Sequence, residues 1–170
     1  MSFSAVVIDP PWFERGGGKI KRGADRHYPL LLEHEIIETV LRCPYWDIDP
    51  HAHLYLWATN NHLESALFVM RALGFRYVTN LAWAKPKIGL GQYFRGQHEL
   101  VLFGVRAKGR GTIHRTDDRS VSSLLEAPQG SHSEKPEDFY ARVERRSRGP
   151  YLELFARSLR EGWLCWGDEL

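Results

Sequence analysis

The sequence predicts an α/β domain built on a mostly parallel sheet. Short apolar runs rich in β-branched residues alternate along the chain with amphipathic stretches of helical period. That order is typical of parallel strands joined by helices. Several of the strand-like runs are apolar at every position, as expected for strands covered on both faces. A length of 170 residues suits one core, so we expect residues 1–170 to form a single domain.

The expected strands are rich in β-branched and aromatic side chains, which fit a pleated, half-buried surface. The first is Ala-Val-Val-Ile at residues 5–8, and it runs straight into Asp-Pro-Pro-Trp. The later runs are residues 54–57, 77–83, 100–105, 151–155 and 163–166.

Helices are expected between these strands, where apolar residues recur at helical spacing. The first covers residues 36–41. The second has Asn60 or Asn61 as its N-cap and Gly74 as its stop. The third, residues 136–147, begins with proline, carries acids in its first turn and has arginines near its end, which complements the helix dipole.

Charge is nearly balanced, with 23 Lys and Arg against 21 Asp and Glu, so the whole chain is not a strongly basic nucleic-acid binder. Basic residues nevertheless cluster at 15–26, 106–115 and 142–148. Such clusters are usually solvated faces, but two of these flank glycine-rich loops, where backbone can approach a phosphate.

Other patterns narrow the class of protein. No apolar stretch is long enough to span a bilayer and no signal peptide is evident, so we expect a cytoplasmic protein without membrane contact. Cys43 and Cys165 lack metal-ligand spacing and are expected to be free thiols. The histidines show no ligand spacing either, and we predict no metal.

The tetrapeptide Asp9-Pro10-Pro11-Trp12 is the candidate catalytic motif. Each proline fixes its own φ and pushes the preceding residue out of the helical region. The carbonyls of Asp9 and Pro10 should therefore point in fixed directions, with no neighbouring N–H group bound to them. A carboxylate and a rigid carbonyl beside an aromatic ring suit chemistry on the amino group of a planar base. The alternative is a purely structural turn.

Short sequence motifs, which follow one another along nearly the whole chain, make it resemble the MT-A70 family of S-adenosylmethionine-dependent adenine methyltransferases. They are Asp9-Pro10-Pro11-Trp12, His27-Tyr28-Pro29, Leu56-Trp57-Ala58-Thr59-Asn60, Trp83-Ala84-Lys85, Arg95 with His98-Glu99, Lys135-Pro136, Glu153-Leu154-Phe155-Ala156-Arg157 and Trp166-Gly167-Asp168-Glu169.

The resemblance implies a Rossmann-like class I methyltransferase sheet that is circularly permuted, with the catalytic strand first and the cofactor strand near the C-terminus. Ile8–Asp9 should then lie beside Leu154–Phe155, so that methyl donor and acceptor face each other across the switch point of the sheet.

The expected cofactor is S-adenosyl-L-methionine. Asp168 and Glu169 end a strand where nucleotide-binding folds bind ribose. The resemblance adds Lys135 near the methionine end and Arg157 near the ribose, with Ile8 and Phe155 at the strand ends.

The substrate side should include polar and aromatic side chains that receive an extruded adenine. The residues expected there are His27, Tyr28, Asn60, Lys85, Arg95, His98 and Glu99. Trp57 and Trp83, which lie inside strands, are expected to be core residues instead.

The predicted function is methyl transfer to the 6-amino group of adenine in DNA, by analogy with compact microbial and phage members of the family. Alternatives are an RNA adenine methyltransferase, a non-catalytic subunit that only binds nucleic acid, and a small-molecule methyltransferase. The sequence leaves open whether the chain acts alone, as a homodimer or with a different partner, and whether Asp9 is a general base.

Overall fold

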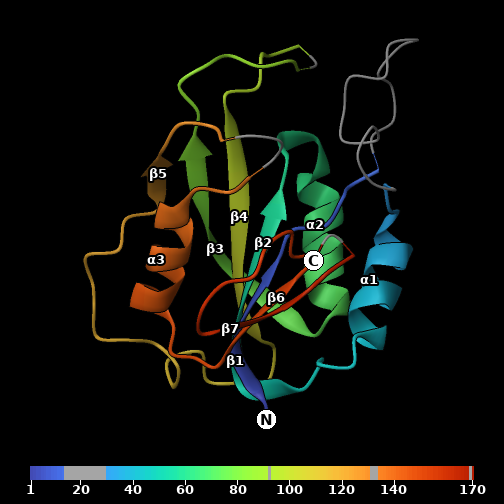
Figure 1. The fold of residues 1–170 in the computed structure, drawn as a ribbon, viewed down its shortest axis with the longest axis vertical. Coiled ribbons are helices and arrows are strands. Elements are labelled where there is room, and N and C mark those ends of the chain that lie inside the picture. Colours follow the sequence, from blue (N-terminus) through green and yellow to red (C-terminus); the bar gives the residue numbers. More distant parts are fainter. Residues whose placement is uncertain (14–29, 92, 131–133, 169) are drawn as a thin grey trace.

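The computed structural model describes residues 1–13, 30–91, 93–130, 134–168 and 170. A seven-stranded sheet in the order β5-β3-β4-β2-β1-β6-β7 forms its middle layer (Figure 1). Neighbouring strands are parallel except where β4 pairs with β2 and with β3. The predicted α/β class is confirmed. The strands are β1 (Phe3–Ile8), β2 (Ile48–Ala58), β3 (Phe75–Ala84), β4 (His98–Arg106), β5 (Leu124–Glu126), β6 (Tyr151–Leu154) and β7 (Trp163–Trp166).

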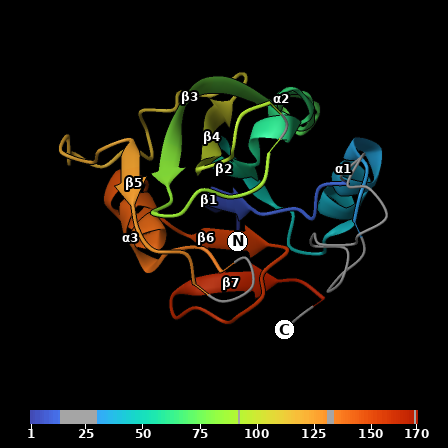
Figure 2. The same ribbon diagram turned by 90° about the horizontal axis from the view of Figure 1, so that it is seen from above.

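Helices cover both faces of the sheet (Figure 2). One face packs against α1 (Glu33–Arg42) and α2 (Leu63–Ala72), and the other packs against α3 (Glu137–Arg146). Each face therefore has its own hydrophobic cluster. None of the helices in the described part of the chain is long and apolar enough to span a bilayer.

Strand β1 shows why the first apolar run is a central strand. Side chains of a strand alternate between the two faces of a sheet. Val6 and Ile8 accordingly belong to the cluster under α1 and α2, while Val7 belongs to the cluster under α3. All three are fully buried, because β1 lies between β2 and β6 with helices on both sides.

Strand boundaries were harder to predict than strand positions. β2 begins at Ile48 rather than at residue 54, because Ile48 already pairs with Phe3 of β1, before a register shift that ends where Ala5 pairs with His53. β5 was missed, since three residues carry no readable period. The first half of β3 is exposed on its outer side, so not every strand is covered on both faces.

Two helix starts also differ from the prediction. Asn60 and Asn61 lie inside a 3-10 turn (η2, Asn60–His62) whose N-cap is Thr59, so neither caps α2. Pro136 is the N-cap of α3 rather than its first helical residue. Gly74 does end the α2 segment, with a φ of +83° that glycine adopts without strain.

The predicted junction of the two ends of the chain is confirmed. Ile8 pairs with Leu154 in the parallel β1–β6 ladder, and the Asp9 N–H donates to the carbonyl of Leu154 over 3.5 Å. The residues that follow β1 and β6 therefore emerge side by side.

Candidate active site

Seven strand ends meet at one edge of the sheet, at the upper end of Figure 1. The carboxyl ends of β1, β2, β3, β5, β6 and β7 lie there because these strands are parallel to one another. Strand β4 runs the opposite way, so its first residues reach the same edge. Asp9, Lys85, Glu99 and Arg157 are brought together in this way from distant parts of the sequence. In open α/β sheets ligands bind at this edge.

The Asp-Pro-Pro turn is held by backbone hydrogen bonds. The Pro11 carbonyl accepts from the N–H of Leu31 over 2.7 Å, and the Pro10 carbonyl accepts from the N–H of Trp12 over 2.9 Å. The expectation that no neighbouring N–H binds the Pro10 carbonyl is therefore wrong, because the chain turns tightly enough at Pro11 to return Trp12. A carbonyl oxygen has two lone pairs, so one acceptor position remains.

Five charged side chains form a connected cluster around Asp9. Lys135 Nζ lies 3.3 Å from Asp9 Oδ1 and 3.1 Å from Glu99 Oε2. Lys85 Nζ lies 2.5 Å from the other oxygen of Glu99, and Arg157 Nη2 lies 3.9 Å from Asp9 Oδ2. Lys135 also sits over the ring of Trp57, at 4.7 Å from its centroid. The carboxylate of Asp9 is thus bordered by two cations, at distances longer than the 2.7–2.9 Å of a tight charged hydrogen bond.

Burial gives the acids of this cluster different proton affinities. The side chain of Asp9 is 15% exposed, and burial raises its pKa, although Lys135 and Arg157 act in the opposite direction. Burial also acts to raise the pKa of Glu99, but Lys135 and Lys85 outweigh it, so this pKa is lowered. Burial disfavours the charged form of Lys135, yet Asp9 and Glu99 together raise its pKa. Asp9 is therefore the carboxyl group of the cluster with increased affinity for a proton.

Trp12 is built into the core rather than presented as a free stacking surface. Its side chain is 7% exposed, and its indole N–H donates to the carbonyl of Trp57 over 3.0 Å. One face of the ring stacks on His62, with centroids 5.5 Å apart. That its ring stacks on a target base stays a prediction, and the covered face is not available for it. The prediction that Trp57 and Trp83 are core residues is confirmed.

His62 is a residue that the sequence analysis missed. Its Nε2–H donates to the carbonyl of Phe13 over 3.0 Å, because a carbonyl can only accept, and its Nδ1 accepts from the hydroxyl of Thr59 over 2.6 Å. His62, which follows the end of the neighbouring strand β2, thereby fixes the ring of Trp12. The only signal in the sequence was a histidine three residues after a threonine at the end of an expected strand.

The ends of β6 and β7 form a narrow junction beside Asp9. Phe155 has a φ of 60°, a left-handed conformation that non-glycine residues rarely adopt and that is common at ligand sites. The N–H of Ala156 donates to the carbonyl of Trp166 over 3.1 Å. A Cβ at Gly167 would overlap the carbonyl oxygen of Ala156, so this approach requires glycine. Asp168 follows with an exposed side chain.

Not every predicted site residue joins the cluster. Ile8 is fully buried in the core, so its side chain offers no surface to a ligand, and a contact of its backbone with the cofactor stays a prediction. Asn60, Arg95 and His98 are exposed at or near the same edge, without contact to Asp9. His27, Tyr28 and Glu169, together with the basic segment 15–26, lie outside the described residues. Among the residues that the structure describes, no group of three or more His, Cys, Asp or Glu could hold a metal ion.

Comparison with known proteins yields a consistent set of relatives. The family model of MT-A70 matches residues 3–169. The type II methyltransferase M.MunI of Mycoplasma sp is 34% identical over 192 residues, an alignment that covers 99% of this chain and 78% of the relative. An N(6)-adenosine-methyltransferase MT-A70-like protein of Arabidopsis thaliana is 28% identical, and the catalytic subunit METTL3 of the human N(6)-adenosine-methyltransferase is 25% identical. The chain covers only 24% and 28% of those two proteins.

Proposed function

The chain belongs to the MT-A70 family, and from this premise we propose that it transfers a methyl group from S-adenosylmethionine to the 6-amino group of adenine in DNA. One observation carries the proposal. The carboxylate of Asp9 lies at the carboxyl end of β1, beside the end of β6, with Lys135 and Arg157 next to its two oxygens. A methyl acceptor bound to Asp9 is therefore adjacent to the strand end where a nucleotide cofactor binds in α/β sheets.

The acceptor needs help from the protein because the amino nitrogen of adenine is a weak nucleophile, with its lone pair delocalised into the ring. In our proposal Asp9 accepts one N–H of that amino group, and the remaining lone pair of the Pro10 carbonyl accepts the other. Two acceptors on opposite N–H bonds pull the nitrogen toward tetrahedral geometry and localise its lone pair. Most of the acceleration then comes from positioning by a rigid turn.

Asp9 also suits the transfer of the proton that must leave after methylation. Burial raises the pKa of Asp9, so this carboxylate binds a proton more readily than an exposed aspartate does. Lys135 and Arg157 limit the rise and favour the ionised form that the acceptor requires. In the proposal Asp9 Oδ2 or Oδ1 receives the amino proton and passes it to water.

The residues at the edge fit the proposed cofactor. S-adenosylmethionine, when bound, supplies an electrophilic methyl group on a sulfonium. Lys135 and Arg157 are cations suited to its carboxylate and ribose, and the exposed carboxylate of Asp168 at the end of β7 can accept ribose hydroxyls. The junction at Gly167 leaves no room for a Cβ, which lets a ligand approach the backbone closely.

We further propose that the sheet is a permuted class I methyltransferase sheet, since the strand that bears Asp9 is first in the chain and the proposed cofactor strands β6 and β7 are last. The preference for DNA is supported by the 78% coverage of a type II methyltransferase, against about a quarter of the relatives named adenosine methyltransferases. RNA is the second candidate substrate, because those relatives match over the whole of this chain.

Methyl incorporation tests the proposal directly. Purified protein is incubated with tritiated S-adenosylmethionine and, separately, with duplex DNA, single-stranded DNA and RNA of matched sequence. We expect label in 6-methyladenine, with DNA preferred over RNA. Label in RNA alone would identify RNA, and not DNA, as the substrate. Absence of label from all three, together with no binding of S-adenosylmethionine by calorimetry, would favour a non-catalytic subunit instead.

A further inference from the structure

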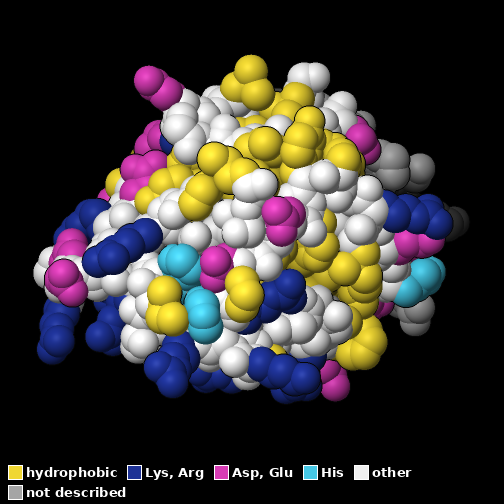
Figure 3. All heavy atoms as spheres, turned by 90° about the horizontal axis from the view of Figure 1, so that it is seen from below, with side chains coloured by type: hydrophobic (Ala, Val, Ile, Leu, Met, Phe, Trp, Pro, Cys, Tyr) yellow, Lys and Arg dark blue, Asp and Glu magenta, His cyan; other side chains and the backbone are white. Residues whose placement is uncertain are grey.

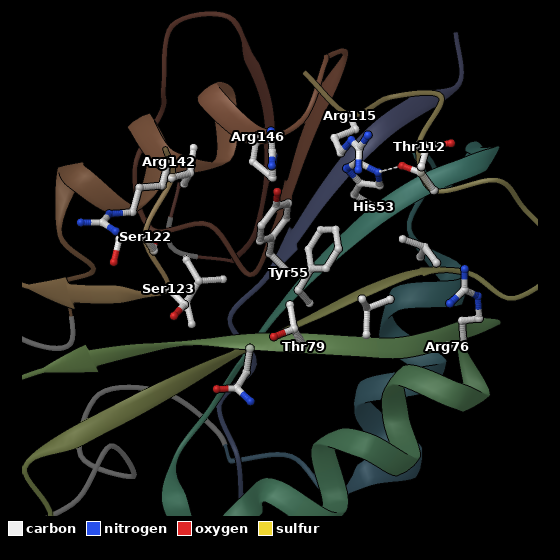
Figure 4. Close-up of a pocket in the computed structure, with 17 residues that line it drawn as sticks. His53, Tyr55, Arg76, Thr79, Thr112, Arg115, Ser122, Ser123, Arg142 and Arg146 are labelled. Carbon is white, nitrogen blue, oxygen red and sulfur yellow. Dashed lines mark hydrogen bonds between the residues drawn. The ribbon is translucent and has the colours of Figure 1, made fainter. Parts of the chain in front are cut away.

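A cavity lies on the α3 side of the sheet, away from the edge that bears Asp9 (Figure 4). Its volume is about 420 Å³. Strands β2, β3 and β4 form its floor, and the segment after β4 and the last turns of α3 form its walls. His53 of the floor pairs with Ala5, four residues before Asp9, which is roughly 13 Å back along the strand. None of the residues that line the cavity belongs to the candidate active site.

The walls join two of the basic clusters seen in the sequence, 106–115 and 142–148. Arg115 and Ser147 form an antiparallel bridge, and the N–H of Arg148 donates to the carbonyl of His114 over 2.7 Å. Arg115, Arg142 and Arg146 thereby line one cavity, with Arg76 of β3 across from them. Figure 3 shows Lys and Arg side chains gathered on this side of the molecule, toward α3 and β3.

The positive charge of the cavity is largely uncompensated. Its lining includes four arginines and no Asp or Glu. Arg142 pairs with Asp138 at 2.9 Å, but Arg76, Arg115 and Arg146 form no ion pair with any residue that the structure describes. Arg146 donates to the carbonyls of Thr116 and Asp118, and its buried Nε has no hydrogen-bond partner. A partly buried cation held by neutral carbonyls favours an anion beside it.

The part of the floor formed by β2 and β4 is uncharged and internally satisfied. The Tyr55 hydroxyl donates to Ser147 Oγ, the Ser147 hydroxyl donates to Nδ1 of His53, and His53 Nε2–H donates to the carbonyl of Gly111. The direction of these three hydrogen bonds follows from the last one, because the carbonyl of Gly111 can only accept a hydrogen bond. The rings of Tyr55 and Phe103 pack edge to face at 5.1 Å. This part of the floor is therefore rigid and places no charge against a ligand.

We infer that this cavity binds a nucleotide, with the base over the ring of Phe103, which the buried Tyr55 supports, and the phosphate at the arginines of the lining. Arginine binds phosphate oxygens in paired hydrogen bonds, and the volume lies within the range of small-molecule sites. Hydroxyls of Thr79, Thr112, Ser122 and Ser123 supply further partners for a sugar or phosphate. The source is either a free nucleotide or one unit of a nucleic-acid strand. The inference requires neither Asp9 nor methyl transfer.

Calorimetric titration with uridine 5′-monophosphate (UMP) tests this site, because UMP lacks the adenine that the proposed active site takes. We expect one UMP per chain, with uridine and inorganic phosphate each at least about tenfold weaker. Arg76→Ala and Arg115→Ala should each weaken UMP binding about tenfold, the effect of one charge-assisted hydrogen bond. Both side chains are exposed and make no ion pair within the described residues, so the melting temperature should stay unchanged.

Arg71→Ala is the matched control, since it removes an exposed arginine of α2 on the opposite face of the sheet. A single-stranded 12-mer distinguishes the two sources. If it binds more tightly than UMP and loses affinity in the same variants, the source is a strand; if UMP binds as tightly, the source is a free nucleotide. Failure of both probes to bind overturns the inference, as does equal loss in Arg71→Ala or equal affinity for phosphate and UMP.

Discussion

Replacing Lys135 with methionine should destabilise the protein and change the proton affinity of Asp9. Lys135 is 9% exposed and is the one side chain of the described cluster that contacts both Asp9, at 3.3 Å, and Glu99, at 3.1 Å. Methionine preserves much of the packing on Trp57 but removes the charge. The substitution therefore isolates the electrostatic contribution of Lys135.

The expected loss of stability depends on which cations remain beside Asp9 and Glu99 after the substitution. Removing one partner of a buried ion pair costs about 3–5 kcal/mol. Glu99 keeps Lys85 at 2.5 Å and Asp9 keeps Arg157 at 3.9 Å, so neither is left without a cation. We expect the lower end, about 3 kcal/mol of the free energy of unfolding. Lys85→Met, which leaves Lys135 on Glu99 and does not contact Asp9, should cost clearly less.

Urea denaturation followed by tryptophan fluorescence measures the loss, and the pH dependence of methyl transfer measures the effect on Asp9. Lys135 lowers the pKa of Asp9, so its removal should raise that pKa. Because the ionised form accepts the amino group, the acid limb of the profile should move to higher pH in Lys135→Met and stay in place in Lys85→Met. Equal stability losses, or an acid limb that does not move, would refute the reasoning.

Other substitutions test the remaining parts of the account. Asp168→Ala should weaken S-adenosylmethionine binding about tenfold by calorimetry, through loss of one hydrogen-bonded carboxylate; unchanged affinity would remove Asp168 from the cofactor site. Burial raises the pKa of Glu153 above its ordinary 4.5, so the ionised form lowers stability at neutral pH, and this loss disappears as the pH falls below 4.5. Glu153→Gln can still accept from the Tyr140 hydroxyl and should melt no lower than the parent at pH 7.5, with any gain gone near pH 4; a lower melting temperature at pH 7.5 contradicts this. Gly167→Ala should cost about 1–3 kcal/mol because its Cβ meets the Ala156 carbonyl, and an unchanged unfolding midpoint would argue against that contact.

The fold was predictable where apolar patterning decides it. The run at residues 5–8 is buried on both faces and became the central strand β1, and the expected junction of Ile8 with Leu154 is present. The start of β2 was not predictable, because its first residues are polar and the β1–β2 ladder shifts register between Ile48 and His53. The three-residue strand β5 is likewise set by tertiary pairing with β3.

The candidate site was predictable in composition but less so in detail. Asp9, Arg157, Lys85 and Glu99 meet because strand direction carries their positions to one edge, and Lys135 joins them from the residue before the N-cap of α3. The hydrogen bond from Trp12 to the Pro10 carbonyl and the stacking of Trp12 on His62 depend on turn geometry and side-chain packing, and neither leaves a pattern in the sequence. For the same reason the arginine-lined cavity was visible only as two separate basic clusters.

The most direct measurement of the central claim is mass spectrometry of nucleosides from host DNA after expression of the parent chain or of Asp9→Asn. Asparagine keeps the shape of Asp9 but loses the charge and one acceptor position. We expect 6-methyladenine to accumulate with the parent and to be absent with Asp9→Asn, while the variant still folds and binds S-adenosylmethionine. Methylation that persists in Asp9→Asn at the level of the parent would contradict the assignment of the Asp9 carboxylate to the reacting amino group.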